Sequence, residues 1–202
     1  MLASAWESLA GRSKQREDFT AARRIAEHAA SMSKPTPEIL TVLGYQQQQD
    51  HDFEAAELSY RRAVQGDPSL ALAQNNLASL LTSENKDLDF ALAAANKAAS
   101  DPRNPNRPDF LETLANVQAK MGHPLDAANT LQTALQLRPD QPDWQIEVVK
   151  YLADGGQRDD ARNALVRFER RPAGMQSLAP DLQERIRVLH NQLESNGQAA
   201  SN

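Results

Sequence analysis

Histidine is the side chain most often used for acid–base chemistry near neutral pH, and it occurs four times without any catalytic arrangement. His28, His51, His123 and His190 stand far apart in the sequence. None lies in an HExxH pattern or beside a carboxylate at the spacing of a helical metal site. We interpret all four as turn or surface residues, and we expect no bound metal ion.

Other catalytic signatures are missing as well. The chain has no cysteine, which excludes disulfide bonds, thiol nucleophiles and zinc bound by cysteine. The pair Gly155-Gly156 is interpreted as a helix end, because it lacks the flanking pattern of a phosphate-binding loop. No Gly-x-Ser-x-Gly motif occurs. We therefore predict that the chain is not an enzyme and uses no cofactor.

Charge and hydropathy restrict the partners. The 202 residues carry a formal net charge of -5 with a pI near 5.4, whereas a protein that binds nucleic acid through its phosphates needs a basic face. No apolar run reaches the length of about 18 to 20 residues that spans a bilayer. We predict no nucleic-acid partner and no direct membrane insertion.

The cellular compartment stays open between cytoplasm and periplasm. The absence of cysteine fits both, and the first residues, MLASAWESLAG, lack the basic start and apolar block of a signal peptide. A repeat that begins almost at Met1 would also fit a fragment of a longer protein.

Residues 37–70 contain two amphipathic helical patterns joined by a short polar turn. Apolar and small residues recur at helical spacing in each half; they are Leu40, Leu43, Gly44, Phe53, Ala56, Tyr60 and Ala63. The turn Asp50-His51-Asp52 offers an aspartate as helix N-cap. Glycine inside a helix costs about 1 kcal/mol relative to alanine, so we expect Gly44 to allow close approach of the second helix at Ala56. The segment predicts a helical hairpin.

Related hairpins lie on both sides of this one. We predict a single α-helical solenoid over residues 1–195 with five repeats, at 3–36, 37–70, 71–107, 108–141 and 142–175. A capping helix over 179–194 closes the stack with an apolar stripe, and residues 196–202 form a disordered tail. The segment 101–108 contains three prolines. We interpret it as a rigid connector between repeats, with a domain boundary or hinge as the alternative.

The repeats resemble the tetratricopeptide repeat (TPR) family over about residues 3–172. The central unit matches its pattern at Leu40, Leu43, Gly44, Ala56, Tyr60, Ala63 and Pro68. It departs from the pattern at Gln47, where the family carries tyrosine, and at His51, where the family carries glycine. The resemblance implies an all-α, right-handed superhelix of antiparallel helix pairs that binds peptides or proteins.

The family also implies a concave groove lined by the first helix of each repeat. Carried over, the groove residues are Thr41, Tyr45, Gln48, Gln49, Asn75, Asn76, Ser79, Glu112, Thr113, Asn116 and Lys120. They are polar and nearly neutral. The carboxylate clamp of chaperone-binding members is not predicted, because Asp109 and Glu112 stand where that clamp needs cations.

Two functions are compatible with this sequence. The first is a protein–protein interaction scaffold whose groove holds a peptide or protein segment. The alternative is a structural spacer or self-assembly module within a larger bacterial envelope, secretion or polysaccharide-related protein, for which self-association is possible. The identity of the protein partner is not encoded in any recognisable motif.

Overall fold

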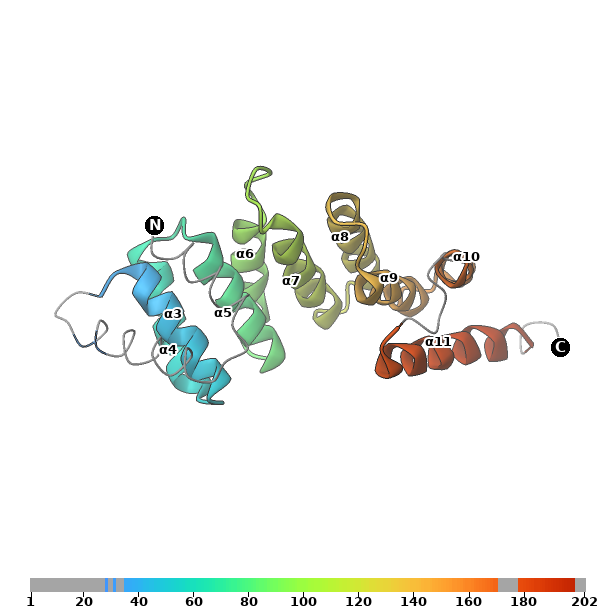
Figure 1. Ribbon diagram of the computed structural model, residues 1–202, viewed down its shortest axis with the longest axis horizontal. Coiled ribbons are helices and arrows are strands. Elements are labelled where there is room, and N and C mark those ends of the chain that lie inside the picture. The colour runs from blue at the N-terminus through green and yellow to red at the C-terminus, as the bar shows by residue number, and fades with distance from the viewer. Residues whose placement is uncertain (1–27, 29–30, 32–34, 171–177, 199–202) are drawn as a thin grey trace. The chain divides into compact units, whose positions relative to one another are not determined.

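The computed structural model describes residues 28, 31, 35–170 and 178–198 (Figure 1). The described residues form α-helices joined by turns, with no strand among them. The chain divides into two compact units between Ser100 and Asp101. The first unit contains α3 (Pro37–Gln49), α4 (Phe53–Gly66), α5 (Ala71–Ser83) and α6 (Leu88–Ala98). The second contains α7 (Arg107–Lys120), α8 (Pro124–Leu137), α9 (Pro142–Asp154), α10 (Arg158–Glu169) and α11 (Pro180–Gln198).

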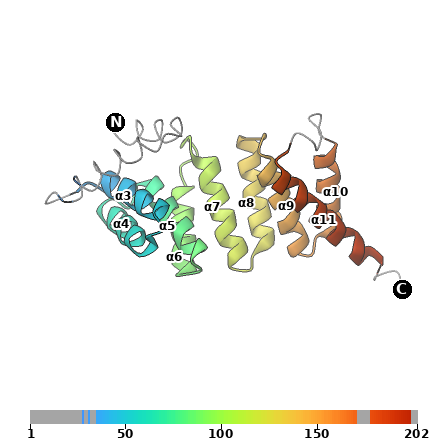
Figure 2. The same cartoon turned by 60° about the horizontal axis from the view of Figure 1, so that its bottom comes forward.

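In each unit, consecutive helices pack as antiparallel pairs. In the first unit α3 packs on α4 and α5 packs on α6, while α4 and α3 both contact α5. In the second, α7 packs on α8, α8 on α9, and α9 on α10 (Figure 2). The predicted all-α, solenoid-type fold of helix pairs is confirmed, and four of the five predicted repeats correspond to these pairs.

Some sequence predictions fall outside the described residues. Nearly all of the first repeat, 3–36, and the last residues, 199–202, belong to this group. The division between the units falls at the start of the proline-containing segment 101–108. One continuous solenoid over 1–195 stays a prediction.

The α3–α4 hairpin is held by caps that its sequence supplies. The side chain of Thr36 accepts a hydrogen bond from the backbone N–H of Ile39 at 3.4 Å, and that of Asp52 accepts one from Ala55 at 3.2 Å. Each satisfies a helical N–H that has no partner within its own helix. The aspartate cap predicted in the Asp50-His51-Asp52 turn is thereby confirmed at Asp52.

Gly44 makes room for an aromatic ring rather than for Ala56. A Cβ atom added at Gly44 would lie 2.7 Å from two ring carbons of Tyr60, which reaches it from α4. Tyr60 is fully buried, so its rigid ring has nowhere to move. The close approach expected at Gly44 exists, but the predicted partner was wrong: Ala56 is buried in the same hairpin, and the closest atoms belong to Tyr60.

All four described hairpin turns share one backbone device. At the same place in each turn stands a residue with positive φ: His51 (63°), Asn85 (54°), Gly122 (84°) and Gly156 (81°). The next residue donates its N–H to a carbonyl five positions earlier, as His123 does to Gln118 at 2.9 Å. This pattern is the Schellman helix end, whose left-handed residue is most often glycine.

The helix α11 closes the second unit as predicted from its apolar stripe. Leu182, Ile186, Leu189 and Leu193 are all buried, and α11 packs against α9 and α10. The guanidinium of Arg162, on α10, donates to the backbone carbonyl of Leu193 at 2.8 Å. The helix continues to Gln198, beyond Glu194 where the predicted cap ends.

Within the part of the chain that the structure describes, no helix is long and apolar enough to cross a bilayer.

Candidate functional site

In the first unit, three of the predicted groove residues gather around the hydroxyl group of Tyr60. This hydroxyl donates to Oε1 of Gln48 on α3 at 3.1 Å and is hydrogen-bonded to Asn76 on α5. Burial raises the pKa of Tyr60 far above its ordinary value, and the nearby Tyr45 adds to the increase. The phenol is thus neutral and serves as a fixed bridge between two helices. We call Tyr45, Gln48, Tyr60 and Asn76 the tyrosine–amide cluster.

The remaining predicted residues of the first unit differ in accessibility. Gln49 and Ser79 are exposed and stand on the same two helices as the cluster. Thr41 is only 3% exposed, and its hydroxyl donates to the carbonyl of Pro37 at 2.8 Å. The side-chain oxygen of Asn75 is buried and has no hydrogen-bond partner. A buried acceptor left unpaired lowers the stability of the folded protein by about 1–3 kcal/mol.

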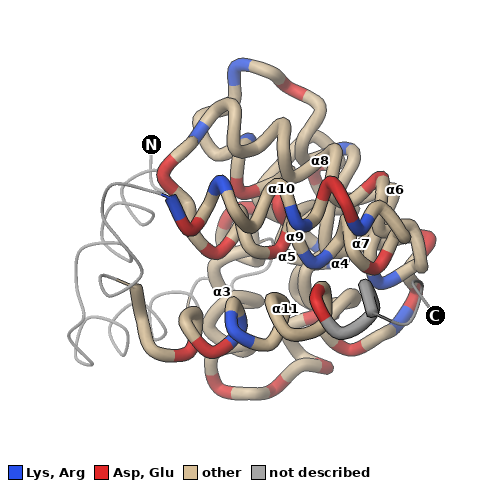
Figure 3. The backbone as a smooth tube through the Cα atoms, turned by 90° about the vertical axis from the view of Figure 1, so that its right-hand side faces the viewer, with Lys and Arg blue, Asp and Glu red and all other residues tan. Residues whose placement is uncertain are grey.

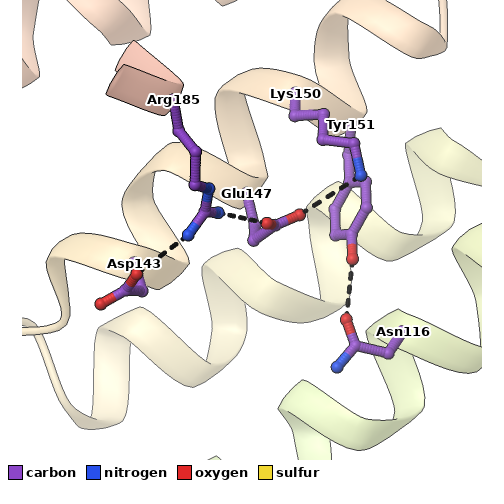
Figure 4. A network of polar contacts seen from close by, with 6 residues as sticks. All are labelled: Asn116, Asp143, Glu147, Lys150, Tyr151 and Arg185. Carbon is purple, nitrogen blue, oxygen red and sulfur yellow. Dashed lines mark hydrogen bonds and ion pairs between the residues drawn. The ribbon is translucent and has the colours of Figure 1, made fainter. Parts of the chain in front are cut away.

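The second unit carries charge at the starts of α7 and α9. Asp109 and Arg138 form a two-pronged ion pair with N···O distances of 2.6 and 2.9 Å. Arg185, on α11, pairs with Asp143 at 3.0 Å and with Glu147 (Figure 4). These acids therefore each have an arginine partner.

Glu112 lies among these acids but, unlike them, forms no ion pair with an arginine. Burial, the largest cause, raises the pKa of its carboxyl above the ordinary value. A hydrogen bond from Trp144 works in the opposite direction, and the three neighbouring carboxylates add to the increase. Among the described residues, no lysine or arginine lies within ion-pair distance of Glu112. The predicted groove residue is therefore a half-buried carboxylate without an ion pair of its own, although the charge of Arg138, the partner of Asp109, also acts on it.

The middle of the same face is fixed by a tyrosine on the next repeat. The hydroxyl of Tyr151 donates to Oδ1 of Asn116 at 2.8 Å (Figure 4). Burial raises the pKa of Tyr151 far above its ordinary value, so this phenol also stays neutral. The bond joins α7 to α9 and holds the Asn116 amide in one orientation.

A cavity of about 460 Å³ opens at the C-terminal ends of α7 and α9. Two predicted groove residues, Asn116 and Lys120, line it. Its other lining residues are Ala119, Gly122, Pro124, Lys150, Tyr151 and Asp154. Thr113 lies one helical turn before Asn116 and is half-buried.

The sequence did not indicate several residues of this face. Lys150 and Asp154 stand one repeat after Asn116 and Lys120, so extending the groove pattern into the fifth repeat would have found them. Tyr151 was missed because the fifth repeat matches the pattern loosely. Arg185 belongs to the capping helix, for which the repeat pattern makes no prediction.

Charge elsewhere is interspersed along the helices (Figure 3). The described residues include no group of three or more histidine, cysteine, aspartate or glutamate side chains placed to hold a metal ion. Of the histidines, His51 and His123 lie in turns, and His190 contacts Glu169 and Glu194 on the surface. His190 and Glu194 are four residues apart on α11, so one histidine does stand at helical spacing from a carboxylate, contrary to the prediction from the sequence.

Comparison with solved structures gives the relationships of the fold. PilF of Pseudomonas aeruginosa matches with a TM-score of 0.74 at 22% sequence identity, over 98% of this chain and 86% of the PilF chain. MamA from AMB-1 matches with a TM-score of 0.66 at 15% identity, over 76% of this chain and 89% of its own. MamA (41-end) from Desulfovibrio magneticus RS-1 matches with a TM-score of 0.66 at 16% identity, over 82% and 92%.

No protein-family model matches the sequence, and no curated protein gives a significant match. At the identities above, the structural likeness concerns the fold alone. PilF and MamA are TPR-repeat proteins, so the predicted tetratricopeptide-type fold is confirmed.

Proposed function

We propose that this chain, which has the tetratricopeptide-repeat fold, is a non-catalytic scaffold. In this proposal it binds a segment of another protein along the first helices of its repeats. The observation that carries this proposal is the fixed polar arrangement on those helices. Buried tyrosines hold the amides of Gln48, Asn76 and Asn116 in place, each from a neighbouring helix or repeat. Amide and hydroxyl groups of this kind suit hydrogen bonding to the backbone of an extended peptide.

Each unit offers its own binding face in this proposal. The first-unit face consists of the tyrosine–amide cluster with Gln49 and Ser79. The second-unit face, which we call the α7–α9 face, consists of Glu112, Asn116, Lys120, Lys150 and Asp154. Preorganised side chains lose little conformational entropy on binding, which favours recognition without rearrangement.

The proposal is tested by selecting peptides from a displayed random library with the whole chain and then measuring affinities by fluorescence anisotropy. Replacing Asn76 or Asn116 by alanine should weaken binding of the peptides seated on that residue's unit by about 1 kcal/mol or more per lost backbone contact. Gln65→Ala and Gln132→Ala are matched controls, because both glutamines are exposed on second helices. Their affinities should stay at the wild-type level.

Two results would overturn the scaffold. One is a library in which no peptide is enriched. The other is enriched peptides that bind the Asn76→Ala and Asn116→Ala variants as tightly as the parent while circular dichroism shows intact helices. Either outcome would favour the spacer or self-assembly function, for which light scattering at increasing concentration distinguishes a constant mass from a growing one.

A further inference from the structure

The α7–α9 face has opposite charges at its two ends. The charges of Asp143 and Glu147 on α9 act on the carboxyl group of Glu112 on α7, which indicates that the starts of the two helices lie close together. The ends of both helices also lie together, since Lys120 and Lys150 line one cavity. The two helices therefore run in the same direction, with acidic side chains at one end and lysines at the other.

At the acidic end, a single carboxylate remains for a partner. Arg138 pairs with Asp109, Arg185 pairs with both Asp143 and Glu147, and Nζ of Lys150 lies 3.7 Å from the second carboxylate oxygen of Glu147. Glu112 accepts the Trp144 hydrogen bond and interacts with the charge of Arg138 without an ion pair of its own, and its half-buried position amid like charges makes its ionised form costly. A basic side chain from outside would relieve that cost, because an opposite charge close by favours the ionised carboxyl.

At the lysine end, hydrogen-bond donors predominate. The Oδ1 atom of Asn116 accepts from Tyr151, so its Nδ2 amide remains for another acceptor. Lys120 and Lys150 are both exposed at the cavity. The charged lining residues are these two lysines and Asp154, so lysine charge exceeds carboxylate charge in the lining, while Lys150 also forms an exposed ion pair with Glu147 at 3.7 Å outside it. Such a site favours an acidic side chain.

The distance between the acidic end and the lysine end of the α7–α9 face determines how far apart two complementary charges must lie in a bound segment. Glu112 and Lys120 lie on one face of α7, and eight residues of α-helix rise about 12 Å. An extended segment rises about 3.3 Å per residue, so about 13 Å separates residues four apart. Side chains two or four apart also point to the same side of an extended segment, whereas those three apart do not. A four-residue separation satisfies both conditions.

We propose that the α7–α9 face binds an extended protein segment carrying one basic and one acidic side chain four residues apart, the basic one at Glu112 and the acidic one between Lys120 and Lys150. The inference rests on the proposed scaffold function and specifies the partner of its second unit. The segment can run in either direction along the face, so the order of the two charges along its sequence is settled by the experiment.

The test uses synthetic nine-residue peptides of serine, alanine and threonine with blocked termini, so that side chains supply the only charges. Two peptides carry Lys and Glu four residues apart, in the two orders. Two comparison peptides carry Lys and Glu next to each other, or Gln at both places. Binding to the full chain is followed by NMR chemical-shift titration. We expect one of the four-apart peptides to bind about three- to tenfold more tightly than the comparison peptides, with the difference shrinking at high salt.

Variants assign each charge to its place. Glu112→Gln should remove the preference for Lys over Gln in the peptide while the preference for Glu persists. The double variant Lys120→Gln with Lys150→Gln should do the reverse. Lys97→Gln, which changes an exposed lysine on α6 in the other unit, should alter neither preference.

Equal binding of the four-apart and adjacent peptides would overturn the inference, and so would variants that weaken all peptides alike. If library-selected peptides bind the first unit and none of the charged peptides binds the second, the inference fails and the scaffold function stands. If no peptide of either kind binds, both fail.

Discussion

The two units use the same helix positions for different chemistry. The face of the first unit is uncharged: tyrosine, glutamine, asparagine and serine side chains stand on α3 and α5, tied together by Tyr60. The face of the second unit is dipolar, with Glu112 at one end and Lys120 and Lys150 at the other. Hydrogen bonds between neutral groups depend little on ionic strength, whereas exposed charge pairs are screened by salt. One fold thus offers a salt-tolerant face and a salt-sensitive one.

The interiors of the two units differ as well. The α3–α4 hairpin combines Gly44 with Tyr60, whereas the corresponding positions of α7 and α8 hold Ala115 and Leu131, both buried. A smaller residue on one helix is matched by a larger residue on the other. The total volume at such a contact is conserved while its shape changes, which is the kind of exchange that helical cores tolerate.

The largest expected effect tests this packing difference. Gly44→Ala places a Cβ atom against the immobile Tyr60 ring and should destabilise the protein by about 1–3 kcal/mol. Adding Tyr60→Leu recreates the Ala–Leu combination of the second unit and should recover part of the loss. The free energy of unfolding of both single variants and the double variant, measured with chemical denaturant, gives the coupling.

If the losses in unfolding free energy of the two single variants simply add in the double variant, the Tyr60 ring and the added Cβ atom at position 44 do not interact. Amide hydrogen exchange provides the control, because the loss of protection should concentrate in α3 and α4.

A smaller effect is expected in the hairpin turns. The left-handed position is filled by His51 and Asn85 in the first unit and by Gly122 and Gly156 in the second. Gly122→Ala forces a Cβ atom into that conformation and should cost about 1–2 kcal/mol. His51→Gly removes a similar strain, but it also loses the edge-on contact with the Phe53 ring, so it should stabilise by about 1 kcal/mol at most.

Thermal unfolding of these two variants measures the contrast. A lower melting temperature for both would mean that the His51 ring contact outweighs the backbone strain, and an unchanged Gly122→Ala variant would contradict the strain argument.

The smallest effect concerns the charge of Glu112. Because its folded-state pKa is raised, the folded protein holds that proton more tightly than the unfolded chain, and stability falls as the pH rises through the interval between the two pKa values. Glu112→Gln cannot ionise and can still accept from Trp144. The variant should therefore be more stable than the parent at pH 7, and this advantage should disappear below about pH 4, near the ordinary pKa of glutamate.

Denaturant unfolding at several pH values tests this expectation. Glu54→Gln is the control, since Glu54 is exposed in the first turn of α4, where the helix dipole favours a carboxylate. An advantage of Glu112→Gln that is independent of pH would point to packing rather than to charge.

Much of the fold follows from the sequence, because helical periodicity, proline and capping residues act locally. Identifying the atoms that meet across a hairpin requires more. Gly44 signalled a close approach, but periodicity places Ala56 and Tyr60 on the same helix face and does not tell which one reaches across. His51 stands where the family carries glycine, but its positive φ was not predicted from the sequence and is seen only in the structure.

The candidate faces were less predictable than the helices. Thr41 fits the groove pattern, yet its hydroxyl bonds to its own helix. The raised pKa of Glu112 depends on its burial beside Trp144 and on acids in a neighbouring repeat, none of which is visible from the spacing within its own repeat. Arg185 reaches the face from outside the repeats altogether.

The helix α11 has a further consequence for the assembly of repeats. A stack of repeats has an apolar surface at each end, through which identical stacks could associate end to end. The buried stripe of α11 covers that surface on α9 and α10, and Arg162 fastens the helix through the carbonyl of Leu193. The helix therefore occupies the surface on which a further repeat of the same kind would have to pack at this end of the second unit.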